Sequence, residues 1–247
     1  MSMFSTLCRF VSGAAGDVMN LFFPPACPLC GGPLSANEHF VCTSCRFGAP
    51  LTDFASEECN PMAERLRDML PVKQAAALMW FVDGSDWQRI IHEFKYRSRP
   101  RFAYLMGEWL GGVLASGGLY ADVEAVVFVP LHPLKRLARG YDQTEIIAEG
   151  VASSLGVPVI RGAVVRRVNN PSQALHHEQE RWENVEGIFA VRRPEKLRGR
   201  HVLLVDDVFT TGATMVSCSS TILSSCEGVT LSIATLAVTQ RDMAADR

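Results

Sequence analysis

The stretch that decides the fold is His201-Val-Leu-Leu-Val-Asp206-Asp207-Val-Phe-Thr210-Thr211-Gly212-Ala213-Thr214. Its apolar beginning is typical of a buried strand, and a short Thr/Gly loop then opens a helix from Gly212 onward. Amides at a helix N-terminus bind phosphate, threonine hydroxyls add hydrogen bonds, and glycine lets the backbone approach the anion. The stretch therefore predicts a phosphate-binding loop that follows a strand.

Two adjacent carboxylates, Asp206 and Asp207, stand between the strand and the loop. Carboxylates accept hydrogen bonds from hydroxyl groups, so the pair suits a ribose that carries the phosphate. The loop lacks the lysine of a Walker A motif, which disfavours a nucleotide triphosphatase. The competing interpretation is an ordinary strand-to-helix turn in which Asp207 or Thr210 caps the helix. A cap, however, explains neither the acidic pair nor the run of threonines.

Apolar runs alternate with amphipathic stretches from about residue 74 onward. We expect strands at 75–82, 123–130, 201–205 and 229–238, and helices at 87–94, 102–114, 144–155 and from Gly212 onward. This alternation predicts an α/β domain with a mostly parallel sheet. In such sheets ligands bind at the carboxyl ends of the strands.

Four of the eight cysteines form two Cys-x-x-Cys pairs, Cys27 with Cys30 and Cys42 with Cys45. Two such turns supply the four thiolates that tetrahedral zinc prefers, so we expect a structural zinc site. His39, between the pairs, is an alternative ligand, and a labile disulfide is the competing interpretation. Cys59 has no partner cysteine at the spacing of a third pair.

The charge is nearly balanced, with 24 Lys plus Arg against 26 Asp plus Glu. The overall charge therefore gives no argument for nucleic-acid binding, and any anion-binding site must be local. No uninterrupted apolar run reaches the length of about 18 residues that a membrane span needs. Cys-x-x-Cys pairs suit a reducing compartment, so we expect a cytoplasmic protein.

We expect three parts along the chain. Residues 1–23 carry apolar side chains at helical spacing and predict an amphipathic helix rather than a signal peptide. Residues 24–72 hold the zinc module and a linker with one short helical turn, and residues 73–247 form the main domain.

The phosphate loop resembles the phosphoribosyl pyrophosphate motif of type I phosphoribosyltransferases. From about residue 20 to residue 240 the chain is similar to the ComF family. The resemblance rests on the following segments in order: Phe23 to Cys30, the second cysteine pair, Phe94-Lys-Tyr-Arg97, Val129 to Pro133, Arg136-x-x-Arg139-Gly-Tyr-Asp142-Gln143, Arg166-Arg167, Arg181 to Asn184, and the phosphate loop. The chain departs from the family at Asp142, where asparagine is usual, and at Cys59, which lacks its partner.

The resemblance implies a type I phosphoribosyltransferase fold that binds phosphoribosyl pyrophosphate together with magnesium. It gives Asp206 and Asp207 the catalytic role of holding the ribose hydroxyls. It assigns the phosphates to Thr210, Thr211, Gly212, Ala213, Thr214, Lys95, Arg136 and Arg139. It also implies a mobile flap after Arg167 that closes over the pyrophosphate.

Three functions stay open at this point. The first is transfer of the phosphoribosyl group to an acceptor, which no residue set in the sequence identifies. The second is a ligand-sensing protein that keeps the phosphate site without turnover. The third is an accessory factor that handles single-stranded DNA, because members of the resembled family are linked to natural DNA uptake. A homo-oligomer is the commonest default assembly.

Overall fold

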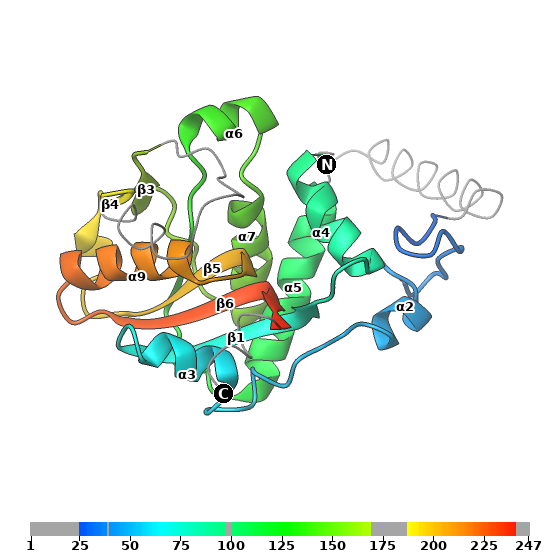
Figure 1. Cartoon of the computed structure of the whole chain (residues 1–247), viewed down its shortest axis with the longest axis horizontal. Helices are drawn as coiled ribbons and strands as arrows, with labels where there is room; N and C mark the ends of the chain where they lie inside the picture. The colour runs from blue at the N-terminus through cyan, green and yellow to red at the C-terminus, as the bar shows by residue number, and fades with distance from the viewer. Residues whose placement is uncertain (1–24, 39, 97–99, 169–186, 241–247) are drawn as a thin grey trace, which may run out of the picture. The chain divides into compact units, whose positions relative to one another are not determined.

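The computed structural model describes residues 25–38, 40–96, 100–168 and 187–240 (Figure 1). Its contacts divide the chain into two compact units, Met1–Ala49 and Pro50–Arg247. Residues 50–72, which the sequence suggests as linker, fall in the second unit. The predicted helix over residues 1–23 and most of the predicted flap lie outside the described residues, so both stay predictions.

The second unit is built on a parallel sheet in the order β1-β6-β5-β2 (Figure 1). Its strands are β1 (Val72–Phe81), β2 (Ala125–Phe128), β5 (His201–Phe209) and β6 (Thr230–Thr239). The run Val202 to Val205 is fully buried, as expected for a strand covered on both faces of a parallel sheet. The predicted α/β class with a mostly parallel sheet is confirmed.

Helices cover both faces of this sheet. In the view of Figure 1, α5 and α7 lie behind the sheet and α9 lies in front of it. The helices described in the second unit are α3 (Pro61–Arg67), α4 (Asp86–Tyr96), α5 (Pro100–Gly117), α6 (Pro133–Arg139), α7 (Gln143–Leu155) and α9 (Ala213–Ser225), with a 3-10 turn at Pro194–Lys196. Beside them, β3 (Val164–Arg166) and β4 (Phe189–Val191) form an antiparallel pair. Of the helices in these ranges, none combines the length and hydrophobicity that a membrane crossing requires.

Glycines bring the backbones of α5 and α7 into direct contact. A Cβ added to Gly107 on α5 would lie 2.2 Å from the carbonyl oxygen of Ile147. A Cβ added to Gly150 on α7 would lie 2.1 Å from the carbonyl oxygen of Tyr104. Both neighbours are backbone atoms, so neither can move aside without shifting a helix. The two glycines therefore set how closely α7 packs.

Helix α6 is not among the helices that we expected from the sequence. His132 caps it, because its Nδ1 accepts a hydrogen bond of 3.3 Å from the amide of Leu134. Pro133 occupies the first turn, and Gly140 ends the helix with a φ of +79°. Proline at the start of a helix and glycine just past its end are ordinary helix signals, so the sequence carried the signals that predict α6.

The contact between α5 and α7 makes a testable prediction. Gly150→Ala should destabilise the protein by about 1–3 kcal/mol, because the new methyl group overpacks a backbone contact. The matched control is Gly112→Ala on α5, where an added Cβ meets nothing within 4 Å. That change should be neutral or stabilising by up to about 1 kcal/mol, since alanine favours helix. Urea unfolding measures both, and equal midpoints for the two variants would contradict the close packing.

Candidate functional site

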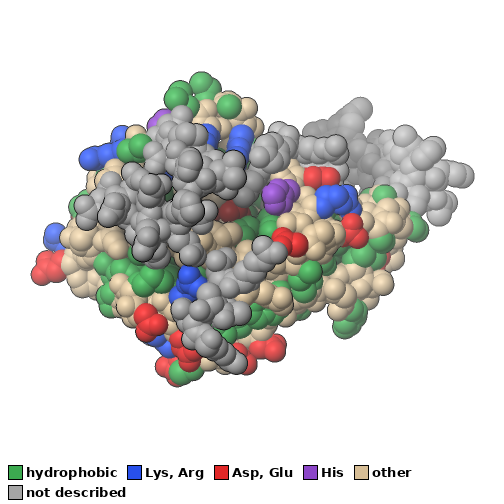
Figure 2. Space-filling view, in the orientation of Figure 1, with side chains coloured by type: hydrophobic (Ala, Val, Ile, Leu, Met, Phe, Trp, Pro, Cys, Tyr) green, Lys and Arg blue, Asp and Glu red, His purple; other side chains and the backbone are tan. Residues whose placement is uncertain are grey.

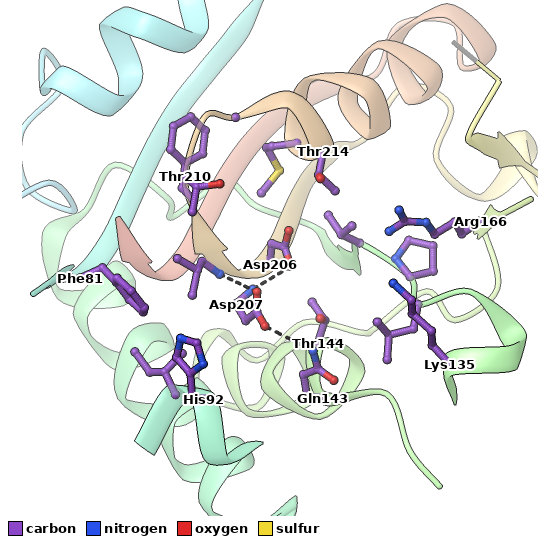
Figure 3. A pocket seen from close by; sticks show the side chains of 18 of the residues that line it. Phe81, His92, Lys135, Gln143, Thr144, Arg166, Asp206, Asp207, Thr210 and Thr214 are labelled. Carbon is purple, nitrogen blue, oxygen red and sulfur yellow. Dashed lines mark hydrogen bonds between the residues drawn. The ribbon is translucent and has the colours of Figure 1, made fainter. Parts of the chain in front are cut away.

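A cavity of about 580 Å³ lies where the sheet strands end (Figure 3). Phe81 contributes from the end of β1, Asp206 to Phe209 from the end of β5, and Val129 to Leu131 from the loop after β2. Helices α4, α6, α7 and α9, the end of β3 and the turn before α9 supply the rest of the lining. The position is the one at which parallel α/β sheets bind their ligands.

The acidic pair, Asp206 and Asp207, lies near the carboxyl end of β5. Asp206 is half-buried and Asp207 is 8% exposed, and both line the cavity. The amide of Asp207 donates to Asp206 Oδ1 at 2.8 Å, and the amide of Val208 donates to Asp207 Oδ1 at 2.8 Å. Gln143 Nε2 on α7 donates to Asp207 Oδ2 at 3.3 Å (Figure 3). The carboxylates are thus oriented by backbone and by a neighbouring helix.

The Thr/Gly loop leaves the first turn of α9 without a side-chain cap. Gly212 is the N-cap residue, its φ is +84°, and it carries no side-chain capping hydrogen bond. The alternative in which Asp207 or Thr210 caps this helix is therefore not what the structure contains. A Cβ at Gly212 would lie 2.8 Å from the Phe209 ring, and the positive φ is itself unfavourable for other residues. Amides at such a helix N-terminus are suited to an anion.

Of the five predicted loop residues, three line the cavity. These are Thr210, Gly212 and Thr214, and Figure 3 shows both threonine side chains beside the acidic pair. Thr211 and Ala213 belong to the same turn without lining the cavity. Their predicted contribution to phosphate binding would have to come through backbone amides.

Basic side chains also line the cavity. They are Lys135 and Arg139 on α6 and Arg166 at the end of β3. In Figure 3, Lys135 and Arg166 lie across the cavity from Phe81. Arg139 Nη1 donates to Gln143 Oε1 at 2.8 Å, which links this guanidinium to Asp207 through Gln143. One cation and one carboxylate of the cavity, Arg139 and Asp207, are therefore joined through hydrogen bonds to the same side chain.

Arg166 is held in place by several contacts. Its guanidinium carbon lies 5.5 Å from the centre of the Phe189 ring, and its Nε donates to the Val168 carbonyl at 3.3 Å. Burial lowers the pKa of Arg166, and the negative charge of Asp206 opposes that shift. A cation that has lost part of its hydration gains more from a bound anion than a fully solvated one does.

The other two predicted cations are placed differently. Arg136 does not line the cavity, because its Nη2 lies 3.0 Å from Glu145 Oε2 in an ion pair. Glu145 also accepts from Arg161 Nε at 3.0 Å. Lys95 belongs to α4, but its side chain lies outside what the structure describes. The phosphate-binding roles of Arg136 and Lys95 stay predictions.

Asp142, where the chain departs from the resembled family, is a structural residue. Its side chain is only 2% exposed and accepts hydrogen bonds from the amides of Leu131 at 2.9 Å and Thr144 at 3.1 Å. Burial raises its pKa, and the amide hydrogen bonds act against that rise. Asp142 caps α7 and ties it to the loop after β2. The departure therefore does not alter the lining of the cavity.

Sequence reasoning assigned no role to several lining residues. Gln143 closes the Arg139-to-Gln143 segment that carried the resemblance, so a signal for it existed. Lys135 sits one residue before a predicted cation. Phe81 and His92 come from segments read as a strand and a helix, and no local motif marks them as site residues.

In the first unit, the four predicted cysteines converge. The sulfur atoms of Cys27, Cys30, Cys42 and Cys45 all lie within 4.8 Å of one another. The Cys30 and Cys42 sulfurs are 3.7 Å apart, which matches the edge of about 3.8 Å that a tetrahedron with Zn–S bonds of about 2.3 Å requires. Among the described residues, this is the one cluster of three or more His, Cys, Asp or Glu side chains that could hold a metal ion.

The surroundings of the cluster favour thiolate ligands. Burial acts to raise the pKa of Cys27, but hydrogen bonds from backbone amides, among them Cys30 and Cys42, outweigh it and lower the pKa to about 7. Burial and hydrogen bonds with the other three cysteines raise the pKa of Cys45. A divalent cation would relieve this competition for charge. The cluster is thus suited to a metal ion such as zinc.

Glu38 and Gly31 shape the polypeptide around this cluster. The carboxylate of Glu38 accepts hydrogen bonds from the amide of Thr43, beside the second pair, and from the amide of Ser35 at 2.8 Å. These bonds, first those from Thr43 and then those from Ser35, lower the pKa of Glu38 to about 2. Gly31, with a φ of +73°, closes the turn after the first pair. His39, the alternative ligand, lies outside the described residues.

Comparison with known proteins agrees with this arrangement. The family described as phosphoribosyl transferase domain matches residues 144–245. Competence protein ComFC of Bacillus subtilis is 26% identical over 190 residues, which cover 76% of this chain and 68% of that protein. DNA utilization protein YhgH of Escherichia coli O6:H1 is 24% identical over 216 residues, which cover 82% of this chain and 92% of that protein.

A solved structure is also similar. It is glutamine phosphoribosylpyrophosphate amidotransferase from B. subtilis, complexed with ADP and GMP, with 18% sequence identity and a TM-score of 0.41. The match covers 59% of this chain and 30% of that chain, so the protein spans less than a third of the enzyme's length.

The domain match, the parallel sheet and the cysteine cluster confirm the predicted fold class, an α/β phosphoribosyltransferase-type fold preceded by a small cysteine module. The resemblance to the ComF family is likewise confirmed: this chain is a homologue of the ComFC and YhgH proteins and carries a phosphoribosyl transferase domain.

Proposed function

We propose that the cavity at the end of β5 binds phosphoribosyl pyrophosphate, or a closely similar 5′-phosphorylated ribose, together with magnesium. One observation carries this proposal. The acidic pair and the uncapped N-terminus of α9 line the same cavity, with Asp206 and Thr214 both on its wall. A ribose and its 5′-phosphate require these two groups side by side.

The remaining parts of the ligand then have partners. Amides of the α9 turn and the hydroxyls of Thr210 and Thr214 would hold the 5′-phosphate. Asp206 and Asp207 would accept hydrogen bonds from the ribose hydroxyls. The pyrophosphate would face the cations of α6 and β3, with Arg139 offering a forked guanidinium.

The protein alone supplies too few oxygen ligands for magnesium, so we expect the ion to bind together with the ligand. The acidic pair supplies two carboxylates, whereas magnesium prefers six oxygen ligands and commonly takes several from substrate phosphates and water. Once bound with the ligand, the ion would neutralise part of the pyrophosphate charge. The protein's own share is to orient Asp206 and Asp207 through the backbone and through Gln143.

The same arrangement suits transfer of the phosphoribosyl group. When pyrophosphate leaves C1, positive charge develops on the sugar and negative charge on the leaving group. We expect Asp206 and Asp207 to stabilise the first charge and Arg139 and Arg166 to stabilise the second, since all four residues line the cavity. A ligand-sensing protein would use the same contacts for binding without release of pyrophosphate.

Calorimetric titration with phosphoribosyl pyrophosphate and magnesium tests the proposal. We expect saturable binding that EDTA abolishes. Asp207→Ala and Arg139→Ala should each weaken binding by about 10-fold or more, because each removes a charge-assisted hydrogen bond worth about 1.5–3 kcal/mol. Arg136→Ala should weaken binding less, since its guanidinium is paired with Glu145 and does not line the cavity. Arg161→Ala is the matched control, because Arg161 pairs with Glu145 and Glu149, does not line the cavity and has no predicted binding role.

The same titrations define what would sink the proposal. Absence of binding at millimolar ligand, in protein shown to be folded by circular dichroism, would remove both the transferase and the sensing interpretation. A larger loss from Arg136→Ala than from Arg139→Ala would overturn the assignment of the leaving-group site to Arg139. Release of pyrophosphate with an acceptor separates transfer from sensing.

We also propose that the cysteine cluster holds a structural zinc ion. Four cysteine ligands leave no open coordination position, so a catalytic role for the metal is disfavoured. Elemental analysis of purified protein should give about one zinc per chain, and Cys42→Ser should lose most of it. Cys59→Ser is the control, because Cys59 is exposed and is not part of the cluster. Stoichiometric iron instead of zinc, or equal metal loss in the control, would contradict the assignment.

A second candidate function is favoured by the relatives, whose names refer to competence and to DNA utilization. We propose as this alternative a competence-related role in which the protein handles single-stranded DNA. We expect the contact at the basic run Arg97, Arg99 and Arg101, of which residues 97–99 lie outside the described residues.

Fluorescence anisotropy with a labelled single-stranded oligonucleotide tests this alternative. Binding should weaken steeply between 50 and 200 mM salt, because it releases counterions. Changing the three arginines of the run to alanine should weaken binding further and flatten its salt dependence. Binding that ignores salt, or that survives the triple change intact, would refute this contact.

A further inference from the structure

Gln143 lies between a cation and a carboxylate of the cavity. Its Oε1 accepts a hydrogen bond of 2.8 Å from Arg139 Nη1, and its Nε2 donates one of 3.3 Å to Asp207 Oδ2 (Figure 3). All three side chains line the cavity. These two hydrogen bonds form a relay, Arg139–Gln143–Asp207, that connects a basic residue of the cavity with the acidic pair.

The amide of Gln143 has one orientation that satisfies both neighbours. An amide oxygen accepts hydrogen bonds and an amide nitrogen donates them, whereas a guanidinium only donates and an ionised carboxylate only accepts. Turning the amide over would set its nitrogen against Arg139 and its oxygen against Asp207. Gln143 is only 3% exposed, so water cannot easily replace either hydrogen bond. The two charged groups therefore hold the amide in a single orientation.

The backbone brings both ends of the relay to this amide. Arg139 is the last residue of α6 and Gln143 is the first residue of α7, and Gly140 turns the chain between them with a φ of +79°. Asp207 accepts from the amide of Val208 through Oδ1 at 2.8 Å and from Gln143 through Oδ2. A guanidinium carries five N–H donors, so its bond to Gln143 does not exhaust its capacity for a phosphate.

The hydrogen bond from Gln143 to Asp207 is long enough to tighten. N–H···O bonds in proteins are commonly about 2.9–3.0 Å long, and this one is 3.3 Å. Such a bond can shorten when a ligand orients the groups that it joins. A ligand group that fixes Arg139 or Asp207 would restrict the amide and favour the shorter bond. The other end of the relay would then already be ordered for its own ligand group.

We propose that Gln143 is a positioning residue that couples the two halves of the ligand. Pyrophosphate at Arg139 raises the affinity for ribose 5-phosphate at Asp207, and ribose 5-phosphate raises the affinity for pyrophosphate by the same factor. This inference rests on the proposed binding of phosphoribosyl pyrophosphate. Ordering by the first half lowers the cost of ordering for the second, and linkage makes the effect equal in both directions. In a transfer reaction, departure of pyrophosphate would also loosen the hold on the phosphoribosylated product.

Calorimetry with the separated halves tests this coupling. Ribose 5-phosphate is titrated in the presence of magnesium with and without saturating pyrophosphate, and pyrophosphate is titrated with and without saturating ribose 5-phosphate. The ratio of the two affinities in each pair of titrations is the coupling factor. We expect a factor of about 5 or more in the wild-type protein, since coupling between sites is typically about 5-fold to 150-fold.

Two variants of Gln143 separate coupling from structural support. Gln143→Met keeps an unbranched side chain of similar length and removes both hydrogen bonds, so the coupling factor should fall to within about twofold of one. Gln143→Glu keeps the acceptor for Arg139 but replaces the donor to Asp207 with a negative charge, so coupling should be lost here too. A residue that only supported the fold would weaken both halves and leave the coupling factor unchanged.

The matched control is Gln88→Met on α4. Gln88 also uses both ends of its amide, because Oε1 accepts from the amide of Gly84 at 2.7 Å and Nε2 donates to Asp83 Oδ1 at 3.1 Å. It does not line the cavity, so this variant should keep the wild-type coupling factor. Circular dichroism and urea unfolding show whether each variant is folded, and the wild-type factor decides the question where one is not.

The outcomes separate this inference from the proposed function. Binding of phosphoribosyl pyrophosphate with a coupling factor of one in the wild-type protein would overturn the inference alone. So would a factor that survives Gln143→Met, because the coupling would then come from magnesium or from contact between the halves. Coupling that depends on Gln143, in protein that does not bind phosphoribosyl pyrophosphate, would support the inference and overturn the proposed function. Absence of binding by both halves and by phosphoribosyl pyrophosphate would overturn the two together.

Discussion

The hydrogen bond of 3.3 Å from Gln143 to Asp207 is the contact on which the candidate site depends. It connects the first residue of α7 with the end of β5, and Arg139 joins it from α6 at 2.8 Å. One residue earlier, Asp142 caps α7 and holds the amide of Leu131 in the loop after β2. Residues 142 and 143 thus position three parts of the site together: the acidic pair, the guanidinium of Arg139 and the loop after the neighbouring strand β2.

This contact requires that α7 lie at a set depth behind the sheet. The depth follows from the glycines that let α5 and α7 touch, since Gly107 and Gly150 each face a backbone carbonyl. A larger side chain at either position would push α7 outward and carry Gln143 away from Asp207. Small residues far from the cavity are therefore part of its construction, because packed helices transmit displacements with little loss.

The sequence predicted the parts of this structure whose signals are local. The strand from His201, the Thr/Gly turn and the cysteine pairs each carry their meaning within about fifteen residues, and periodicity was enough for the α/β class. Cavity residues such as Phe81 and His92 were not predictable in this way, because only the order of strands in the sheet brings them to the same cavity as Asp207. Arg136 and Arg139 show the same limit. Both are arginines of α6 that the sequence assigned to phosphate binding, but in the structure Arg136 pairs with Glu145 and Arg139 donates to Gln143.

The charges of the cavity bear on how a ligand with several phosphates could be held. Among the described lining residues, Lys135, Arg139 and Arg166 carry three positive charges and Asp206 and Asp207 carry two negative ones, which leaves a single formal positive charge. Phosphoribosyl pyrophosphate would bring several negative charges, more than this excess can balance. Burial makes the imbalance more costly, as the lowered pKa of Arg166 indicates for this part of the site. A divalent cation that arrives with the ligand would resolve the imbalance, and the cavity itself needs to supply only the two carboxylates that orient the sugar.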